Sequence, residues 1–279
     1  MHYPKPLFLA PLLFELDQAL LHYLEELSAA DWEAQTTAPQ WKVKDVAAHL
    51  LDGNLRTLSM LRDGYYGEAG PDEQSYGGLV SYLNRLNHDW VAAMRRLSPR
   101  LLIDWLEESG VAYCEYLRRL DNFAPAAFSV AWAGEQESQN WFHVAREYTE
   151  KWHHQQQIRH ATGDPDTLLQ DHWYIPYLDT SLRALPHHYR DISGEAGDML
   201  RIVFRGENDK VWYLHWQEGS WQLLTDTDDE PVAEVILPDA IAWRVFTKGI
   251  SREEALSAAT MIGKEALTTH LFSMIAVMA

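Results

Sequence analysis

A carboxylate and an imidazole lie one helical turn apart in the segment REYTEKWHHQQQIRHATG. Glu150 and His154 are four residues apart, so on an α-helix they project from the same face. Side chains in this arrangement can share one metal ion, because zinc and similar ions accept both at about 2.0–2.2 Å. A solvated polar face is the alternative, since a Glu and a His at this spacing also arise by chance.

Further polar groups crowd the same side of this helix. Projection at about 100° per residue separates His153 from His154, so His153 is not expected to share the site, and His160 is expected on the surface. Either Glu147 or His143 could supply a fourth ligand, which would close the shell around a structural ion. The apolar face consists of Trp141, Ala145, Tyr148 and Trp152. The polar face consists of His143, Glu147, Glu150, His154 and Gln157.

A histidine in an earlier segment, QWKVKDVAAHLLDGN, is a candidate third ligand. His49 projects away from the apolar stripe of Leu51, Leu55 and Leu58, and Gly53 one turn later leaves space beside its ring. Spacing alone does not connect His49 with Glu150. A surface histidine is therefore the alternative interpretation.

The elements that must position these residues are helices over the first 165 residues. Apolar residues at helical spacing predict them, and Ser98 with Pro99 provides an N-cap followed by proline at the first helical position. The segment 64–78, rich in Gly and Tyr, is predicted to be a loop. The predicted helices are 9–28, 43–62, one with its apolar stripe from Leu79 to Met94, 99–120 and 138–162.

From Met199 the periodicity changes to that of short strands separated by turn residues. Helices are predicted again after these strands. Ser251 and Glu254 form a capping-box signature at the start of one of them. We therefore predict a helical bundle over 1–165 and a small α+β domain with an antiparallel sheet over 198–279, each with its own core. A connector over 166–197, with exposed His187 and His188, is predicted to join them. The predicted strands are 199–204, 210–216, 220–224 and 233–237, and the predicted helices 239–248, one after Ser251, and 264–277.

Charge and composition exclude several kinds of partner. The chain has 41 acidic and 23 basic residues and a net charge of −18, so we expect neither nucleic acid nor an anionic membrane surface as a partner. No segment approaches the roughly 20 apolar residues of a membrane span, and the start does not read as a signal peptide. A single cysteine, Cys114, fits a reducing cytoplasm. It lies mid-helix among large residues, where a buried, inert thiol is expected.

Two motifs resemble those of the mycothiol-dependent maleylpyruvate isomerase family, within the DinB/YfiT-like metalloproteins. The string WKVKDVAAHL, from Trp41, is similar to W-(T/S/K)-V-(R/K)-D-V-x-x-H-L. The string REYTEKWHHQQQI is similar to E-x-W-x-H-x-x-D-I, with Gln157 in the place of the aspartate. The region from IVFRGENDKVWYLHW through AEVILPDAIAWRVFTKGIS resembles that family's smaller α+β domain, so the likeness covers nearly the whole chain.

The resemblance implies a DinB-like four-helix bundle in which His49, Glu150 and His154 hold one divalent ion, zinc or nickel. Three protein ligands leave a coordination position open, which is typical of catalytic sites. Ligating histidines need hydrogen-bond partners of their own. The candidates within sequence reach are Asp45, Asp52 and Gln157.

Three functions remain open for such a site. The resemblance favours an enzyme that uses a low-molecular-weight thiol, as an isomerase or S-transferase acting on a small electrophile. A metal-dependent hydrolase of a small ester, amide or phosphate is the second, and a non-catalytic metal-binding module is the third. Arg244 is a candidate anchor for an acidic thiol or substrate, with a plain surface arginine as the alternative.

Overall fold

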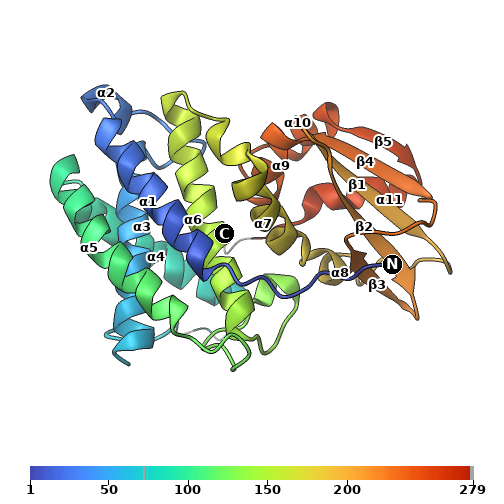
Figure 1. Cartoon of the computed structure of the whole chain (residues 1–279). Coiled ribbons are helices and arrows are strands. Elements are labelled where there is room, and N and C mark those ends of the chain that lie inside the picture. The colour runs from blue at the N-terminus through green and yellow to red at the C-terminus, as the bar shows by residue number, and fades with distance from the viewer. Residues whose placement is uncertain (72, 74, 277–279) are drawn as a thin grey trace.

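Five long helices form the amino-terminal half of the chain. The computed structural model describes residues 1–71, 73 and 75–276. A short helix, α2 (Ala29–Trp32), precedes the segment that leads into α3, and a π-helical turn, η1 (Leu58–Arg62), extends α3. The helices predicted for this half are confirmed, and residues 72 and 74 of the predicted loop lie outside the described residues. The long helices are α1 (Ala10–Glu26), α3 (Val43–Thr57), α4 (Tyr76–Met94), α5 (Pro99–Arg118) and α6 (Asn140–Thr162) (Figure 1).

Local sequence signals place the helix ends. The Ser98 hydroxyl accepts a hydrogen bond from the Leu101 backbone N–H, so it caps α5 as predicted. Helix α6 ends at Gly163, whose φ of 96° lies in the left-handed region that glycine adopts without strain. The start of α5 and the end of α6 are therefore set by residues that can be recognised in the sequence.

The segment 166–197 contains helices rather than an exposed connector. After a 3₁₀ turn, η3 (Thr167–Leu169), come α7 (Asp171–Leu182) and α8 (Leu185–His188). The segment predicted as a connector thus contains helices, and aromatic residues of α7 such as Tyr174 and Tyr177 are fully buried. His187 and His188 lie in α8 and are partly buried, so they are not the exposed loop residues that composition suggested.

A five-stranded sheet follows. Its order is β3-β2-β1-β4-β5, and β4 pairs with β1 in parallel while the other pairs are antiparallel. The predicted antiparallel sheet is therefore a mixed one. After β3, at one edge of the sheet, the chain crosses over β2 and β1, and β4 then pairs with the free side of β1 in the parallel direction. The strands are β1 (Met199–Arg205), β2 (Lys210–Gln217), β3 (Ser220–Leu224), β4 (Ala233–Pro238) and β5 (Thr260–Gly263).

Two short helices lie between β4 and β5, and one follows the sheet. Helix α9 (Asp239–Phe246) precedes α10 (Arg252–Ala258), whose predicted capping box between Ser251 and Glu254 is present. The predicted final helix is shorter than expected: α11 (Glu265–His270) and a 3₁₀ turn, η4 (Leu271–Ser273), give way to extended backbone at Met274. Its expected last residue, Val277, lies outside the described residues.

One hydrophobic cluster joins the bundle to the sheet. It runs from α1 and α6 through α7 to β1, β2 and α9. Trp152 of α6 stacks on Tyr177 of α7, with ring centroids 4.0 Å apart, and contacts the edge of Trp243 of α9 at 6.2 Å. A second cluster fills the space among α1, α3 and α5. The core is thus not divided at the expected connector, and domain boundaries at 165 and 198 stay a prediction. None of the described helices is long and apolar enough to cross a membrane.

Candidate metal centre

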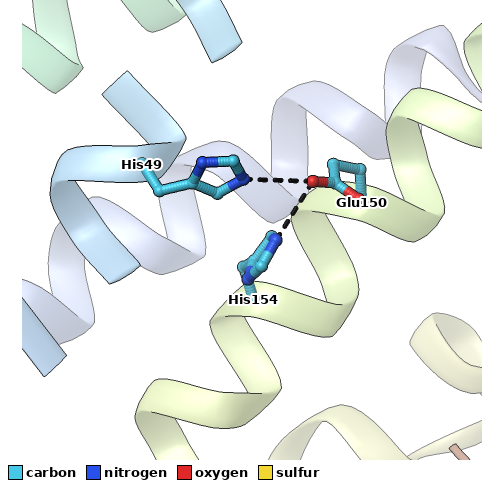
Figure 2. A group of neighbouring side chains, drawn as sticks. All are labelled: His49, Glu150 and His154. Carbon is cyan, nitrogen blue, oxygen red and sulfur yellow. Dashed lines mark hydrogen bonds and ion pairs between the residues drawn. The ribbon is translucent and has the colours of Figure 1, made fainter. Parts of the chain in front are cut away.

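Helices α3 and α6 bring the three predicted ligands together. The His49 Nε2 atom lies 3.2 Å from the Glu150 Oε1 atom, and the His154 Nε2 atom lies 3.0 Å from the same oxygen (Figure 2). The candidate ligand atoms of all three residues lie within 4.8 Å of one another. Residues 101 positions apart in the sequence therefore meet at one point, with one donor atom from each directed toward it.

The donor set fits a divalent ion. Ligand atoms of a four-coordinate zinc ion lie ~3.3–3.6 Å from one another, within a few tenths of an ångström of the two measured separations. His154 Nδ1 faces the Gln157 side-chain oxygen at 2.9 Å, so Nδ1 carries the proton and donates it. In a neutral ring, the lone pair on Nε2 would then face a carboxylate oxygen. Either a second proton or a cation must lie between them, and a divalent ion would satisfy all three residues at once.

Burial and charge set the protonation of the metal-free site. Burial lowers the pKa of His49 to about 4, so its ring is neutral at neutral pH. Burial also acts to lower the pKa of His154, but the Glu150 carboxylate outweighs it and raises that pKa above its ordinary value. For Glu150, burial is likewise outweighed by the charge of His154, and the pKa lies well below its usual range. The site therefore keeps an anionic oxygen next to imidazole nitrogens, as a cation requires.

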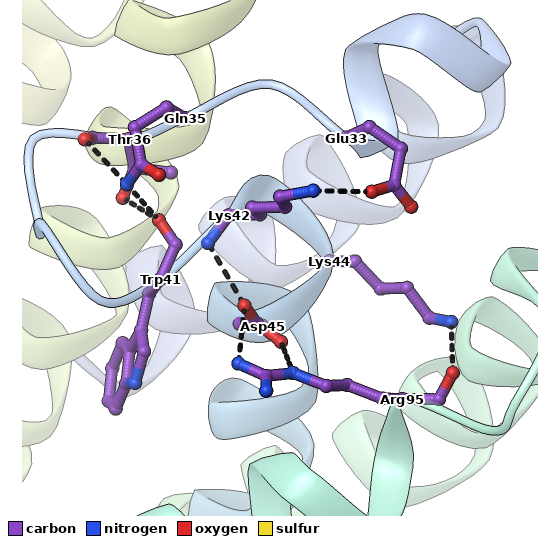
Figure 3. A network of polar contacts seen from close by, with 8 residues as sticks. All are labelled: Glu33, Gln35, Thr36, Trp41, Lys42, Lys44, Asp45 and Arg95. Carbon is purple, nitrogen blue, oxygen red and sulfur yellow. Dashed lines mark hydrogen bonds and ion pairs between the residues drawn. The ribbon is translucent and has the colours of Figure 1, made fainter.

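A polar network fixes the start of α3 and with it His49. The Asp45 carboxylate accepts a hydrogen bond from the Lys42 backbone N–H at 3.1 Å and pairs with the Arg95 guanidinium at 3.0 Å (Figure 3). The Trp41 carbonyl accepts a bond from the Thr36 hydroxyl at 2.7 Å. This holds the Trp41 ring over His49, with centroids 4.8 Å apart. Asp45 thus acts on the helix terminus and is not a partner of a ligating ring.

Of the three residues expected to support the ligands, Gln157 does so directly. It accepts the His154 hydrogen bond in the position where the motif has aspartate, and an amide oxygen can play that part. Asp52 instead faces Arg56, with Oδ2 and Nε 3.1 Å apart. The Nδ1 atom of His49 is buried without a hydrogen-bond partner in the described part of the chain.

The residues considered for a fourth ligand point elsewhere. Glu147 accepts hydrogen bonds from the Tyr113 hydroxyl at 2.8 Å and from Arg146 at 3.1 Å. His143 Nδ1 lies 2.6 Å from the same guanidinium. Among residues 1–71, 73 and 75–276, His49, Glu150 and His154 form the one group of three or more potential ligands. That arrangement favours an open site over a closed structural one.

A cavity of about 230 Å³ opens beside the three ligands. Helix α4, which closes one side, is tied to α3 by a hydrogen bond from the Trp90 indole to the Ala48 carbonyl at 2.8 Å. His153 lines this cavity although it is not one of the grouped ligands, a role that helical projection did not foresee. The lining residues are Trp41, His49, Arg56, Val80, Leu83, Asn84, Asn87, Glu150, His153, His154 and Thr247.

Three further residues singled out in the sequence, Arg244, Cys114 and His160, lie away from the cavity lining. Arg244, on α9, donates from Nε to the Gly249 carbonyl at 3.0 Å and so holds the end of its helix. Cys114 is 4% exposed within α5, and burial raises the pKa of its thiol to about 12. Cys114 is therefore the inert, buried thiol that was predicted. His160 is exposed, as expected.

The fold and site together define a helical bundle that presents a His–Glu–His group to a cavity, joined to a smaller α+β unit. The family described as the mycothiol maleylpyruvate isomerase N-terminal domain matches residues 13–159. This match spans more than half of the sequence, so the chain belongs to that family, as its motifs predicted. The family is named for an enzyme, so the prediction that this protein is an enzyme is confirmed.

Solved structures show the same fold over most of the chain. The crystal structure of the mycothiol-dependent maleylpyruvate isomerase superposes with a TM-score of 0.52, and that of a single-site mutant of it with 0.53. Each alignment covers 90% of this chain and 92% of the other, at 12% sequence identity. No curated protein sequence matches this one. At that identity, the likeness to the solved structures establishes the shared fold.

Proposed function

We propose that this protein is a metal-dependent isomerase that uses a low-molecular-weight thiol. Its substrate would be a small carboxylic acid with a double bond conjugated to a carbonyl group. Mycothiol and maleylpyruvate, which the family's name states, are the thiol and the substrate to test first. The observation that supports the proposal most is the convergence of His49, Glu150 and His154 on one wall of a cavity. All three residues lie within the segment that the family matches.

A divalent ion held by the three ligands would lower the pKa of a thiol or polarise a carbonyl conjugated with the alkene. The thiolate adds to the double bond, and the displaced electron pair moves toward the conjugated carbonyl. Rotation about the resulting single bond and departure of the thiolate give the other geometric isomer. The thiol is regenerated, so no net oxidant, reductant or further reactant is needed.

The chain's own residues prepare this chemistry. Gln157 fixes the ring of His154 by accepting its Nδ1–H, which turns Nε2 toward the site. Trp41 packs against the ring of His49, with ring centroids 4.8 Å apart, and limits the positions that this ring can take. Because Cys114 is buried with a pKa near 12, the reacting thiol comes from outside the chain.

Metal content tests the ligand assignment. Protein purified without chelator should contain about one equivalent of zinc or nickel by elemental analysis, since three N/O ligands hold either ion. His154→Ala should lose most of it, whereas His160→Ala should keep it, because His160 is exposed on the same helix and outside the ligand group. A full equivalent in His154→Ala would refute the assignment.

Turnover tests the reaction. The purified protein should isomerise maleylpyruvate only when mycothiol is added, with a rate that saturates as the thiol concentration rises. Cys114→Ser should keep this activity because Cys114 is buried and inert. Metal-dependent hydrolysis of a simple ester without any thiol would instead show that the protein is a hydrolase. Bound metal without turnover of either kind would establish a metal-binding module.

A further inference from the structure

Two residues that line the cavity have buried polar atoms without a hydrogen-bond partner among the described residues. Both ring nitrogens of His153 and the side-chain oxygen of Asn87 lack a hydrogen-bond partner within the described residues. His153 is only 6% exposed, so water does not solvate its ring freely. Buried polar groups are nearly always hydrogen-bonded, because leaving them unpaired is costly. Because both residues line the cavity, a ligand bound there would supply the missing partners once their side chains turn toward it.

A cation lies in the same cavity. Arg56 follows His49 by two helical turns, so both project from one face of α3. Among the lining residues, Arg56 is the one arginine or lysine. Its Nε faces the carboxylate of Asp52 at 3.1 Å, its one ion pair in the described part of the chain. A guanidinium carries five N–H donors, so this contact leaves donors for a ligand.

The chemistry of these groups selects an acid. Guanidinium binds carboxylates through two parallel hydrogen bonds. The imidazole of His153 has two ring nitrogens, one of which can donate a hydrogen bond while the other accepts one. With Asn87, it can bind an oxygen next to the carboxylate. A cavity of about 230 Å³ suits a small molecule. In a chain of net charge −18, recruiting a small anion requires a local cation.

We propose that Arg56, Asn87 and His153 form a subsite that binds a carboxylate and the hydrogen-bonding oxygen beside it, next to the metal ligands. This subsite rests on the proposed function for its role in turnover, where it would hold the acidic ligand with its reactive carbons toward His49, Glu150 and His154. Arg56 thereby takes the place of Arg244 as the anchor, since Arg244 binds the Gly249 carbonyl and is not part of the lining. The carboxylate can belong to the substrate or to the thiol.

Calorimetric titration of the purified, metal-containing protein with maleate tests the subsite without any turnover. Arg56→Gln should weaken maleate binding by about 10- to 100-fold, the loss expected for hydrogen bonds to a charged group. Uncharged maleamide should show no such dependence on Arg56. Arg62→Gln is the matched control, because Arg62 lies farther along in η1, binds Asp63 and is not a lining residue. It should keep the affinity of the parent protein.

A second variant keeps the test independent of the Arg56–Asp52 pair. Asn87→Asp changes one side chain almost without altering its shape and adds a negative charge to the cavity, so maleate should again bind more weakly. Metal content is measured for each variant. If chelation abolishes maleate binding while Arg56→Gln and Asn87→Asp retain it, the ion alone holds the carboxylate and the subsite is refuted.

Two thiols identify the source of the carboxylate. Cysteine carries a carboxylate and cysteamine does not, so a subsite for the thiol predicts that Arg56→Gln weakens cysteine binding and leaves cysteamine binding unchanged. A subsite for the substrate predicts the loss for maleate instead. Unchanged affinity for both acids would refute the proposal. These measurements detect binding, so an absence of thiol-dependent isomerisation would refute the proposed function and leave this result standing.

Discussion

His154 is the candidate metal ligand whose protonation should depend most on pH near neutrality. Burial acts to lower its pKa, but the charge of Glu150 and the hydrogen bonds to Glu150 and Gln157 stabilise the doubly protonated ring and raise the pKa above the ordinary value of 6.5. A metal ion needs the Nε2 lone pair, so it competes with that proton. His49 differs, because burial already keeps its ring neutral down to a pH of about 4. The two histidines therefore play unequal parts in the same ligand set.

Metal binding should release a proton from His154 near neutral pH. Between pH 6 and the raised pKa of His154, the metal-free protein carries this proton, so the apparent metal affinity should increase as the pH rises through that range. Calorimetric titration of the metal-free protein with zinc at pH 6, in buffers of different ionisation enthalpy, should measure release of most of one proton, because pH 6 lies below the raised pKa. An affinity independent of pH between 6 and 8 would contradict this assignment of the proton.

The sequence reveals the candidate metal ligands more fully than it reveals the rest of the cavity. His49, Glu150 and His154 belong to motifs with fixed spacing, and a shared metal constrains that spacing. The cavity-lining residues Arg56 and Asn87 belong to no motif. They meet His153 only because α4 packs across α3, and helical projection gives no information about contacts between helices.

At the scale of the helices, one buried ion pair joins α1 to α6. The Lys151 ammonium lies 2.7 Å from the Asp17 carboxylate, and the two residues are 4% and 2% exposed. Helix α5 approaches the pair closely: a Cβ at Gly110 would lie 2.2 Å from an Asp17 oxygen. Glycine at this position lets α5 pack against the acid. The pair therefore lies where α1, α5 and α6 meet, next to the apolar contacts that also hold these helices together.

Breaking the pair should destabilise the bundle strongly. Lys151→Met leaves the Asp17 charge buried without compensation, which should lower the free energy of unfolding by about 3–5 kcal/mol. The double variant Asp17→Leu/Lys151→Met removes both charges and should recover much of that loss. Urea unfolding followed by circular dichroism measures both.

The control for this prediction is an exposed ion pair. Arg119 binds Glu115 on α5, and its side chain is 75% exposed, so Arg119→Met should cost no more than about 1 kcal/mol. If Lys151→Met costs as little as Arg119→Met, the buried pair does not hold α1 against α6.

Local periodicity predicts the helices and four strands, but it misses elements defined by distant contacts. β5 is exposed along its length, so it lacks the alternation that marks a strand, and its pairing with β4 creates it. Helix α7 carries Pro176 and many aromatic residues, which weaken the helical pattern. The parallel pairing of β1 with β4 depends on a crossover that no local pattern encodes.

At the scale of the whole molecule, the segment 166–197 belongs to the core. Tyr174, Tyr177 and Tyr189 are fully buried, and Tyr189 donates a hydrogen bond to the Leu267 carbonyl of α11. The amino terminus also crosses between the two parts, because His2 pairs with Asp226 beyond β3 (Figure 1). The bundle and the sheet are therefore tied by α7, by α8 and by the first residues of the chain.

This arrangement changes where a protease should cut. Chymotrypsin cleaves after aromatic residues in backbone that can leave the fold locally, and exposed loops do so at the lowest cost. Tyr65 and Tyr66 follow η1 and are 68% and 60% exposed, whereas the tyrosines of 166–197 are buried. The first cuts should therefore fall after Tyr65 or Tyr66, or in the loop 121–139 with its exposed Phe123. They should not fall at the segment that composition alone marks as a linker.

Mass spectrometry of the first fragments would identify these cuts. The double variant Tyr65→Ser/Tyr66→Ser removes two exposed cleavage sites without touching the core, so it should slow cleavage in that loop and leave the fold intact. Early fragments that end at Tyr174, Tyr177 or Tyr189 would show that 166–197 opens before the bundle loops do. That result would support the predicted division at 165 and 198, because buried tyrosines become accessible only if the shared core separates there first.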